Sequence, residues 1–275
     1  MIKLISEITK KLIALKHEFY KNYAGNSHVQ EFLPMFSSNS FPIDENHLKK
    51  LHEFAESNPI YYNSFEMDLN GIAFRIYEGD INNYWINSLK HDASYQPFYP
   101  TWILSAYLLA LTSKYLGYEK LIDIGSGDGR IAYCGSIVDL VSYSIEIDES
   151  LVELQKTIQS NVSIEFHPIC NDAMQFDYSS FNLSKPEFFI GGLPQQGEML
   201  VTNVLKKIKK TSLAKESGFV LAGTHSKKQF SGNSSIGGWA QVVNGYHLSV
   251  EKILEVPTSW TFDQQTDTPY YFTKF

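Results

Sequence analysis

The N-terminal part of the chain carries apolar residues at helical spacing. They recur three or four positions apart with lysine and glutamate between them, which is typical of a helix with one buried face; the positions are Ile5, Ile8, Leu12, Leu15 and Phe19. We expect this helix to end near Gly25. A Pro- and Ser-rich loop follows over residues 32–46, and within it Asp44 is placed to cap a second helix through about Ser57.

A hairpin signal comes next. Asn70 and Gly71 separate two apolar-rich runs, which is typical of a tight turn between antiparallel strands. The second run can equally begin a helix through Tyr84 to Leu89. Up to about residue 95 the sequence shows neither repeats nor catalytic spacing, so we interpret residues 1–95 as a mainly helical N-terminal appendage.

From Thr101 onward, predicted helices and strands alternate. A helix is predicted that closes at Gly117, and residues 119–125 predict a strand buried on both faces, because they lack polar alternation. The elements expected after it are helices near 130–138, 149–159 and 198–209 and strands at 141–147, 162–169, 187–193 and 218–224. Alternation of this kind implies a parallel sheet with right-handed crossovers.

The alternation of helices and strands does not continue to the end of the chain. Residues 250–262 and 268–275 are two strand-like runs that a polar turn joins, with no helix between them. We therefore expect the last strand to run antiparallel beside its predecessor. The predicted fold class is α/β, with a doubly wound, mostly parallel sheet in a domain over residues 96–275.

Composition sets the broad class. With 275 residues, 43% of them hydrophobic, the chain can bury a sizeable core. Cys134 and Cys170 are too few for a disulfide framework and lack metal-ligand spacing, so we expect a reducing, cytoplasmic setting and no metal. Lysines interrupt the apolar positions of the first 20 residues, which argues against a signal peptide. The most apolar run, Trp102–Leu111, is shorter than the roughly 20 residues that span a bilayer.

The charge balance bears on partners. A net charge of −7 opposes binding to nucleic acid, because that affinity is mostly electrostatic. The run "VLKKIKK", residues 204–210, is a candidate basic patch, but its spacing is also that of the solvated face of an amphipathic helix. An acidic surface would instead attract a basic partner, such as a lysine-bearing protein.

A glycine-rich turn carries the candidate chemistry. The stretch "LIDIGSGDGRIAY" places Gly125, Gly127 and Gly129 between a strand and a helix, with Asp123 before them. Such a turn offers free backbone amides and a positive helix end, and its glycines let a ligand lie against the main chain. The next strand ends in Glu146, whose carboxylate can accept both ribose hydroxyls. The spacing G-x-G-x-G differs from the dinucleotide fingerprint, so the sequence predicts a site for another nucleotide-type ligand.

The stretches "DIGSGDGR" and "SIEIDESLVE" resemble the class I, seven-stranded S-adenosylmethionine-dependent methyltransferases. The resemblance covers about Tyr95 to the C-terminus and implies a Rossmann-like sheet of seven strands with an antiparallel final strand. It implies that Asp123 and the backbone of Gly125 and Gly127 face the methionine end of the cofactor, that Glu146 binds the ribose, and that Asp172 and Ala173 lie beside the adenine. Without the family, Asp172 is a plausible cap or turn residue.

A narrower resemblance lies in "PFYPT", residues 97–101. It is similar to a "YVPT"-type segment of small archaeal protein-lysine methyltransferases and of the related enzymes that modify the ATP synthase c subunit, where it closes over the cofactor. The alternative is a Pro-terminated loop with a helix cap at Thr101. The cofactor-binding residues expected from both resemblances are Tyr99, Thr101, Asp123, Gly125, Ser126, Gly127, Gly129, Glu146, Ile147, Asp172 and Ala173.

The acceptor should lie at the carboxyl end of the fourth core strand, where the chain reads "FFIGGLPQQGEML". Methyltransferases that act on exocyclic base amines usually carry Asn or Asp, Pro-Pro and an aromatic there, and this chain does not. Glu198 is a candidate for steering or deprotonating an amine, or it complements the dipole of the following helix. His225 is a candidate for approaching the acceptor from the next loop, or it is a surface histidine.

These observations lead to one preferred function and two alternatives. The preferred one is methyl transfer from S-adenosylmethionine to an amine nucleophile, a protein lysine first. The first alternative is a small-metabolite methyltransferase in which residues 1–95 form a lid over the pocket. The second is a module that binds the cofactor without catalysis.

Overall fold

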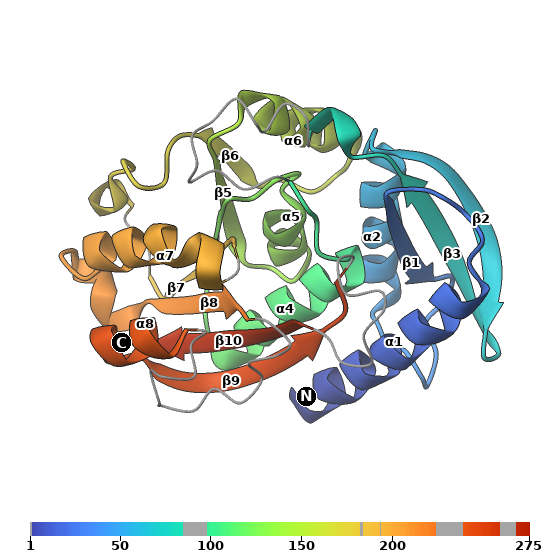
Figure 1. The fold of residues 1–275 in the computed structure, drawn as a ribbon, viewed down its shortest axis with the longest axis horizontal. Coiled ribbons are helices and arrows are strands. Elements are labelled where there is room, and N and C mark those ends of the chain that lie inside the picture. Colours follow the sequence, from blue (N-terminus) through green and yellow to red (C-terminus); the bar gives the residue numbers. More distant parts are fainter. Residues whose placement is uncertain (1, 85–97, 182–183, 193, 224–238, 259–267) are drawn as a thin grey trace.

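The computed structural model describes residues 2–84, 98–181, 184–192, 194–223, 239–258 and 268–275. Within these ranges seven strands form the main sheet: β4 (Lys120–Ile124), β5 (Val141–Glu146), β6 (His167–Cys170), β7 (Pro186–Ile190), β8 (Gly218–Ala222), β9 (Ser249–Val256) and β10 (Thr268–Lys274). Their order is β6-β5-β4-β7-β8-β10-β9 (Figure 1). The order reverses direction at β4, which lies between β5 and β7, and ligands of doubly wound sheets bind at the carboxyl ends beside such a switch point.

The strand directions agree with the sequence. Strands β4 to β8 pair in parallel, and β10 pairs antiparallel with both β8 and β9. The prediction of an antiparallel last strand is therefore confirmed, and the structure adds that β10 is inserted between its two neighbours. The predicted α/β class with a mostly parallel, seven-stranded sheet is also confirmed.

Helices cover both faces of the main sheet. Three of them, α4 (Ile103–Leu116), α5 (Arg130–Ile137) and α6 (Glu149–Asn161), share one hydrophobic cluster with Leu121 and Phe189 of the strands. Helices α7 (Pro194–Ile208) and α8 (Ala240–Tyr246) and the short turns η1 (Tyr178–Ser180) and η2 (Ser212–Glu216) lie on the other face, with Ile122 and Phe188. Neighbouring strand residues therefore serve opposite clusters, because side chains alternate along a strand.

The N-terminal unit, residues 2–84, packs against this domain. It contains α1 (Ile2–Asn22), β1 (Val29–Pro34), α2 (Glu45–Ser57), β2 (Tyr61–Leu69) and β3 (Ile72–Gly79). Helix α1 lies against α4 and β9, and α2 lies against α5 and α6 (Figure 1). Helix α4 is therefore buried between the sheet and the N-terminal unit, which explains why it is hydrophobic on nearly all sides.

Several N-terminal predictions are confirmed. All five residues of the predicted apolar stripe of α1 are buried. Asp44 caps α2 by accepting the backbone N–H groups of Asn46 and His47, at 2.9 and 3.0 Å. Asn70 and Gly71 both adopt left-handed backbone angles, with φ of 56° and 78°, in the tight turn between β2 and β3.

Two N-terminal predictions need correction. The expected mainly helical appendage also contains a three-stranded antiparallel sheet of order β1-β3-β2. The expected loop over residues 32–46 begins as part of β1, which is buried along its whole length and so shows no alternation. The register pairs Val29 with Gly79, and such a distant partner is not visible in a local pattern. The predicted domain boundary at 95 and most of the alternative helix at 84–89 lie outside the described residues.

Some elements of the main domain begin or end elsewhere than expected. Strand β7 ends at Ile190, because the next residues are Gly191 and Gly192, and Gly192 has a φ of 96°. Helix α7 then begins at Pro194 instead of residue 198, with proline at a position that needs no N–H donor. Strand β6 is shorter than predicted, and α8 was not predicted.

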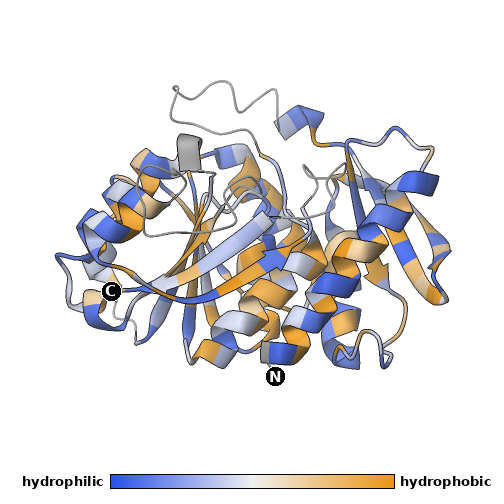
Figure 2. Cartoon of the chain, turned by 60° about the horizontal axis from the view of Figure 1, so that its bottom comes forward, coloured by the Kyte–Doolittle hydropathy of each residue, from blue (hydrophilic) through white to orange (hydrophobic). Residues whose placement is uncertain are grey.

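The surface follows the expected pattern of polarity. Hydrophobic residues gather on the inner sides of the sheets and helices, and hydrophilic residues lie outside (Figure 2). In α7 the apolar residues Val201, Val204 and Leu205 are buried and Lys206 is exposed, so the helical part of the run "VLKKIKK" is amphipathic, with its apolar residues in the core. None of the helices in the described ranges is long and apolar enough to cross a membrane.

Glu187 of β7 is a fully buried acid outside the glycine turn. It lies two residues before Phe189, and therefore on the face of the sheet that α4 covers. Neither carboxylate oxygen makes a hydrogen bond of ordinary geometry among the described residues, although the Ser113 hydroxyl lies close enough to oppose the rise in its pKa. Burial, with help from the nearby Glu251, raises the pKa of Glu187 to about 8.

This pKa makes stability depend on pH. Because the pKa in the folded state lies above the ordinary value of 4.5, the folded protein holds an extra proton, and stability is lost as the pH rises from about 4.5 to about 8. Glu187→Gln removes the ionisation. Between pH 5 and pH 9 we expect the free energy of unfolding of wild type to fall by about 2 to 5 kcal/mol relative to that of the variant. Urea unfolding at both pH values measures this, and equal pH slopes in the two proteins would contradict it.

Candidate functional site

The turn between β4 and α5 depends on three glycines. Gly125, Gly127 and Gly129 have φ angles of 70°, 57° and 77°, a region that side chains disfavour. Gly125 N–H donates to the carbonyl of Ile145 at 2.9 Å, which fixes the turn beside β5. A Cβ at Gly129 would lie 2.9 Å from the ring of Phe166, so this glycine serves the start of α5. The N–H groups of Gly127 and Gly129 are also hydrogen-bonded within the protein, so the free amides expected of this turn are not found at the three glycines.

Glu146 points from the end of β5 to this turn. Its Oε2 accepts the N–H of Gly127 at 2.8 Å, and its Oε1 accepts the N–H groups of Ile147 and Asp148 at 2.9 and 3.1 Å. Burial raises its pKa, and these backbone bonds oppose the rise. A carboxylate offers about four acceptor positions, so three are used and Oε2 keeps one for a ligand. The binding of ribose hydroxyls by Glu146 stays a prediction.

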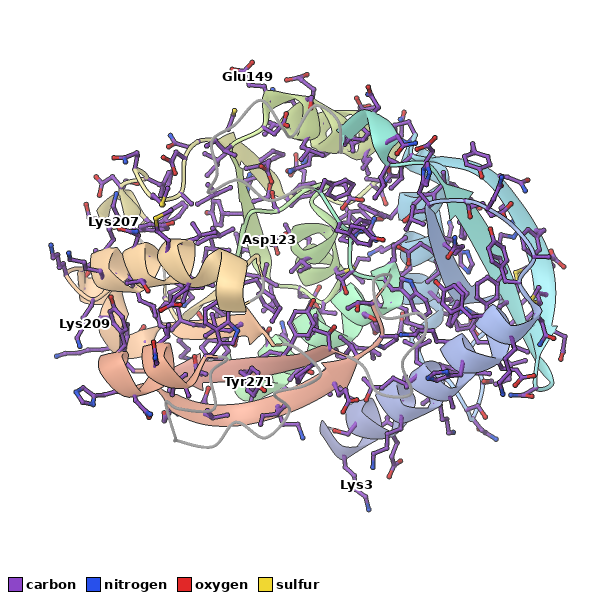
Figure 3. The ribbon with its side chains drawn as sticks, viewed as in Figure 1. Lys3, Asp123, Glu149, Lys207, Lys209 and Tyr271 are labelled. Carbon is purple, nitrogen blue, oxygen red and sulfur yellow. The ribbon has the colours of Figure 1, made fainter. Side chains whose placement is uncertain are left out.

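Asp123 lies at the end of β4, in the middle of the molecule and close to α5 (Figure 3). Its side chain is buried, and its Oδ2 has no hydrogen-bond partner among the described residues. Burial, together with the nearby carboxylates of Glu146 and Asp128, raises the pKa of Asp123 well above its usual range. A buried acceptor without a partner is costly, so the site suits a donor or cation placed against Asp123.

Gln155 of α6 clamps the turn from one side. Its Nε2 donates to the carbonyl of Gly127 at 2.7 Å and to the hydroxyl of Ser126 at 2.9 Å, and its Oε1 accepts the hydroxyl of Ser144 at 2.6 Å. Ser126, a predicted cofactor residue, is thus buried and bound to Gln155. Sequence reasoning missed Gln155, although a glutamine within the apolar stripe of a helix was a signal for it.

Phe98 covers the turn. A Cβ at Gly127 would lie 2.5 Å from the Phe98 ring, so the ring packs directly on the glycine backbone. The sequence singled out Tyr99 and Thr101 of the same segment and missed Phe98. Tyr99 is 38% exposed, and Thr101 is buried and forms a β-bridge with Thr258.

The alternative that Thr101 caps α4 is wrong. The cap position belongs to Trp102, which makes no capping side-chain bond. Instead, the N–H of Ile103 donates to Oε2 of Glu31 in β1 at 2.8 Å. A residue of the N-terminal unit therefore satisfies an amide at the start of α4 that the local sequence leaves unpaired.

The predicted adenine-side residues lie beside β5. Asn171 N–H donates to the carbonyl of Glu146 at 2.9 Å, which brings the turn after β6 next to the glycine site. Asp172 accepts the N–H of Met174 at 2.8 Å and so also has the turn role of the alternative. Ala173 is buried, and Ile147, at the tip of β5, is 39% exposed and leaves an apolar surface free.

The acceptor side lies next to the same turn. Gly191 N–H donates to the carbonyl of Ile124 at 2.8 Å, and a Cβ at Gly191 would lie 3.2 Å from the carbonyl oxygen of Gly125. The end of β7 and the glycine turn are therefore in contact. Glu198 is exposed on α7, in its fifth position and after the first turn. His225 lies outside the described residues.

The strand order and the glycine turn at the switch point define a doubly wound, Rossmann-like fold. Among solved structures with this fold, the chain is similar to the tRNA (uracil-54, C5)-methyltransferase of Pyrococcus abyssi in complex with S-adenosyl-L-homocysteine, at 14% identity and a TM-score of 0.46. That match covers 78% of this chain and 44% of the other, so this chain spans less than half of that enzyme's length.

In two further similar structures the match covers most of the other chain. They are the magnesium protoporphyrin IX methyltransferase of Synechocystis, at 10% identity and a TM-score of 0.41, and a TehB-like SAM-dependent methyltransferase of Corynebacterium glutamicum, at 14% and 0.41. Each covers 62% of this chain, and the matches cover 80% and 86% of those chains. No protein-family model and no curated protein matches the chain.

Proposed function

We propose that this chain is an S-adenosylmethionine-dependent methyltransferase. The observation that carries the proposal is the bond between the Glu146 carboxylate and the N–H of Gly127, which joins the ends of β4 and β5 at the switch point of the sheet. A ligand with a ribose and a charged end fits between a carboxylate and a glycine turn of this kind.

The donor set fits this cofactor. Asp123, whose Oδ2 lacks a partner, would hold the ammonium group of its methionine part, since a buried carboxylate gains most from a cationic donor. The free acceptor position of Glu146 would take a ribose hydroxyl. The exposed Ile147 and the turn at Asp172 and Ala173 would face the adenine. When bound, S-adenosylmethionine supplies an electrophilic methyl group.

The residues of the chain would then align the acceptor and exclude water. Methyl transfer to an amine is an in-line displacement, so orientation provides most of the rate. Phe98, packed on Gly127, would help to keep water from the site. An amine must lose its proton before it attacks, and Glu198 and His225 stay our candidates for steering or deprotonating it.

We further propose that the acceptor is a protein lysine. The support is the "PFYPT" segment, which resembles that of protein-lysine methyltransferases, the net charge of −7, and the absence of an Asn or Asp, Pro-Pro and aromatic run after β7. An acidic surface favours a basic protein partner over a nucleic acid. A cytoplasmic location and a lid role for the N-terminal unit stay predictions.

Methyl-labelled cofactor tests both the methyltransferase activity and the lysine acceptor. The protein is incubated with labelled S-adenosylmethionine and cell extract, with Glu146→Ala as the inactive control. We expect label in a protease-sensitive fraction, and amino-acid analysis should locate it on lysine. Label in filterable small molecules or label released by nuclease would contradict the lysine acceptor and keep the methyltransferase. Binding without any transfer would instead make the chain a cofactor-binding module.

A further inference from the structure

A buried cluster of charges joins the N-terminal unit to the glycine turn. The guanidinium of Arg130, at the start of α5, forms ion pairs with Oε1 of Glu31 and Oδ2 of Asp128, both at 2.5 Å. The Nε of Arg130 also donates to Oδ1 of Asp128 at 2.9 Å. The three side chains are at most 3% exposed. Asp128 stands between Gly127 and Gly129, so the cluster reaches the glycine turn directly.

The N-terminal unit supplies further bonds to the same cluster. The hydroxyl of Tyr61, in β2, donates to Oε1 of Glu31 at 2.9 Å and accepts from Arg130 at 3.2 Å. The amide of Asn58 donates to Oδ2 of Asp128 at 2.9 Å. Arg130 also donates to the carbonyl of Thr101, in the segment that carries Phe98 over the turn. The cluster thus links β1 and β2 with two segments that frame the candidate cofactor site.

Glu31 is the anion that the N-terminal unit supplies to Arg130. Burial opposes the charge on Arg130, but Asp128, Tyr61 and Glu31 outweigh it and raise its pKa well above the usual value, so Arg130 stays a cation. Burial raises the pKa of Glu31, and Arg130 opposes that rise. A buried cation needs its anions in place, since a lost partner leaves a charge without compensation. Removing the charge of Glu31 would therefore let Arg130 and Asp128 shift, and the turn with them.

From this cluster we infer that the N-terminal unit is a working part of the cofactor site and that Glu31 is a positioning residue for the glycine turn. The inference rests on the proposed function. Glu31 acts through Arg130 and Asp128 and also pairs the N–H of Ile103, which fixes the segment before α4. On the other side Gln155 holds Gly127, so the turn is supported from two elements that are distant in sequence.

The test compares binding of S-adenosylhomocysteine with stability. Calorimetry measures the affinity of wild type, Glu31→Gln and Tyr61→Phe, and thermal unfolding without ligand measures the stability of each. Glu187→Gln is the matched control, because it also changes a buried carboxylate at the main sheet but lies away from the turn. We expect Glu31→Gln to weaken binding about tenfold and Tyr61→Phe two- to fivefold, with wild-type affinity for Glu187→Gln.

We expect the kinetics of Glu31→Gln to show weaker cofactor binding as well. In the transfer assay, Glu31→Gln should raise KM for S-adenosylmethionine more than it lowers kcat, since the reacting groups are untouched. Wild-type affinity and KM in folded Glu31→Gln, with only a lower unfolding temperature, would show a purely structural role and overturn the inference. If Glu31→Gln does not fold, unchanged affinity in Tyr61→Phe overturns it. Wild-type protein that fails to bind S-adenosylhomocysteine would instead contradict the proposed function.

Discussion

Replacing Glu146 by alanine is expected to reduce the affinity for S-adenosylhomocysteine by about 100-fold or more. The change removes the acceptor for the ribose and leaves the N–H groups of Gly127, Ile147 and Asp148 without their partner. A 100-fold change corresponds to about 2.8 kcal/mol of binding free energy, and each buried amide that loses its acceptor also costs about 1 to 3 kcal/mol of folding stability. Isothermal titration calorimetry measures the effect.

Glu149 provides the matched control for this variant. It lies three residues further on, at the start of α6 and on the outer edge of the molecule (Figure 3), and it is exposed. Glu149→Ala removes the same charge and side chain, and we expect wild-type affinity, because a single exposed acid at a helix start contributes only about 0.3 to 1 kcal/mol to stability. If Glu146→Ala and Glu149→Ala bind S-adenosylhomocysteine with equal affinity, Glu146 does not bind the ribose.

Gly127→Ala is the second variant with a large expected effect. At a φ of 57° an alanine side chain is strained, and its Cβ would lie 2.5 Å from the ring of Phe98. The ring or the turn must move, and the turn is the surface on which the cofactor would lie. We expect no detectable binding of S-adenosylhomocysteine at concentrations that saturate wild type, together with a loss of stability of about 1 to 3 kcal/mol.

Gly71→Ala separates backbone strain from the contact at the site. Gly71 lies in the β2–β3 turn with a φ of 78°, and nothing lies within 4 Å of a Cβ built there. This control therefore introduces similar backbone strain without a clash. We expect a stability loss of about 1 kcal/mol and unchanged affinity. Normal binding in Gly127→Ala would mean that the cofactor does not lie against this turn.

The N-terminal unit changes the interpretation of both variants. Because Glu31 pairs with Arg130 and Arg130 pairs with Asp128, the glycine turn has support outside the α/β domain that contains it. The effects of Glu31→Gln and Gly127→Ala should therefore not be independent, since residues in one network couple. The smallest unit expected to bind the cofactor tightly is the whole chain, not residues 96–275 alone.

How far the sequence predicted the site depends on the range of each interaction. The sequence singles out Gly125 and Gly127 because glycine is the residue that readily adopts positive φ angles, which both have in the structure. Glu146 was identified because a strand and its terminal acid form a local pattern. The sequence does not single out Phe98, Gln155 or the Glu31 cluster, because each is defined by its contacts with distant residues, and Arg130 meets Glu31 across 99 positions of the chain.

The sequence by itself determined the α/β alternation, the antiparallel last strand, the buried stripe of α1 and the glycine turn beside an acid. Each follows from local periodicity or from the backbone demands of single residues. The tertiary structure alone decided that β1 joins β3, that β10 enters between β8 and β9, and that Glu31 pairs with Arg130 next to the glycine turn. Pairing between distant strands and the burial of opposite charges depend on which surfaces meet, and no local pattern records that.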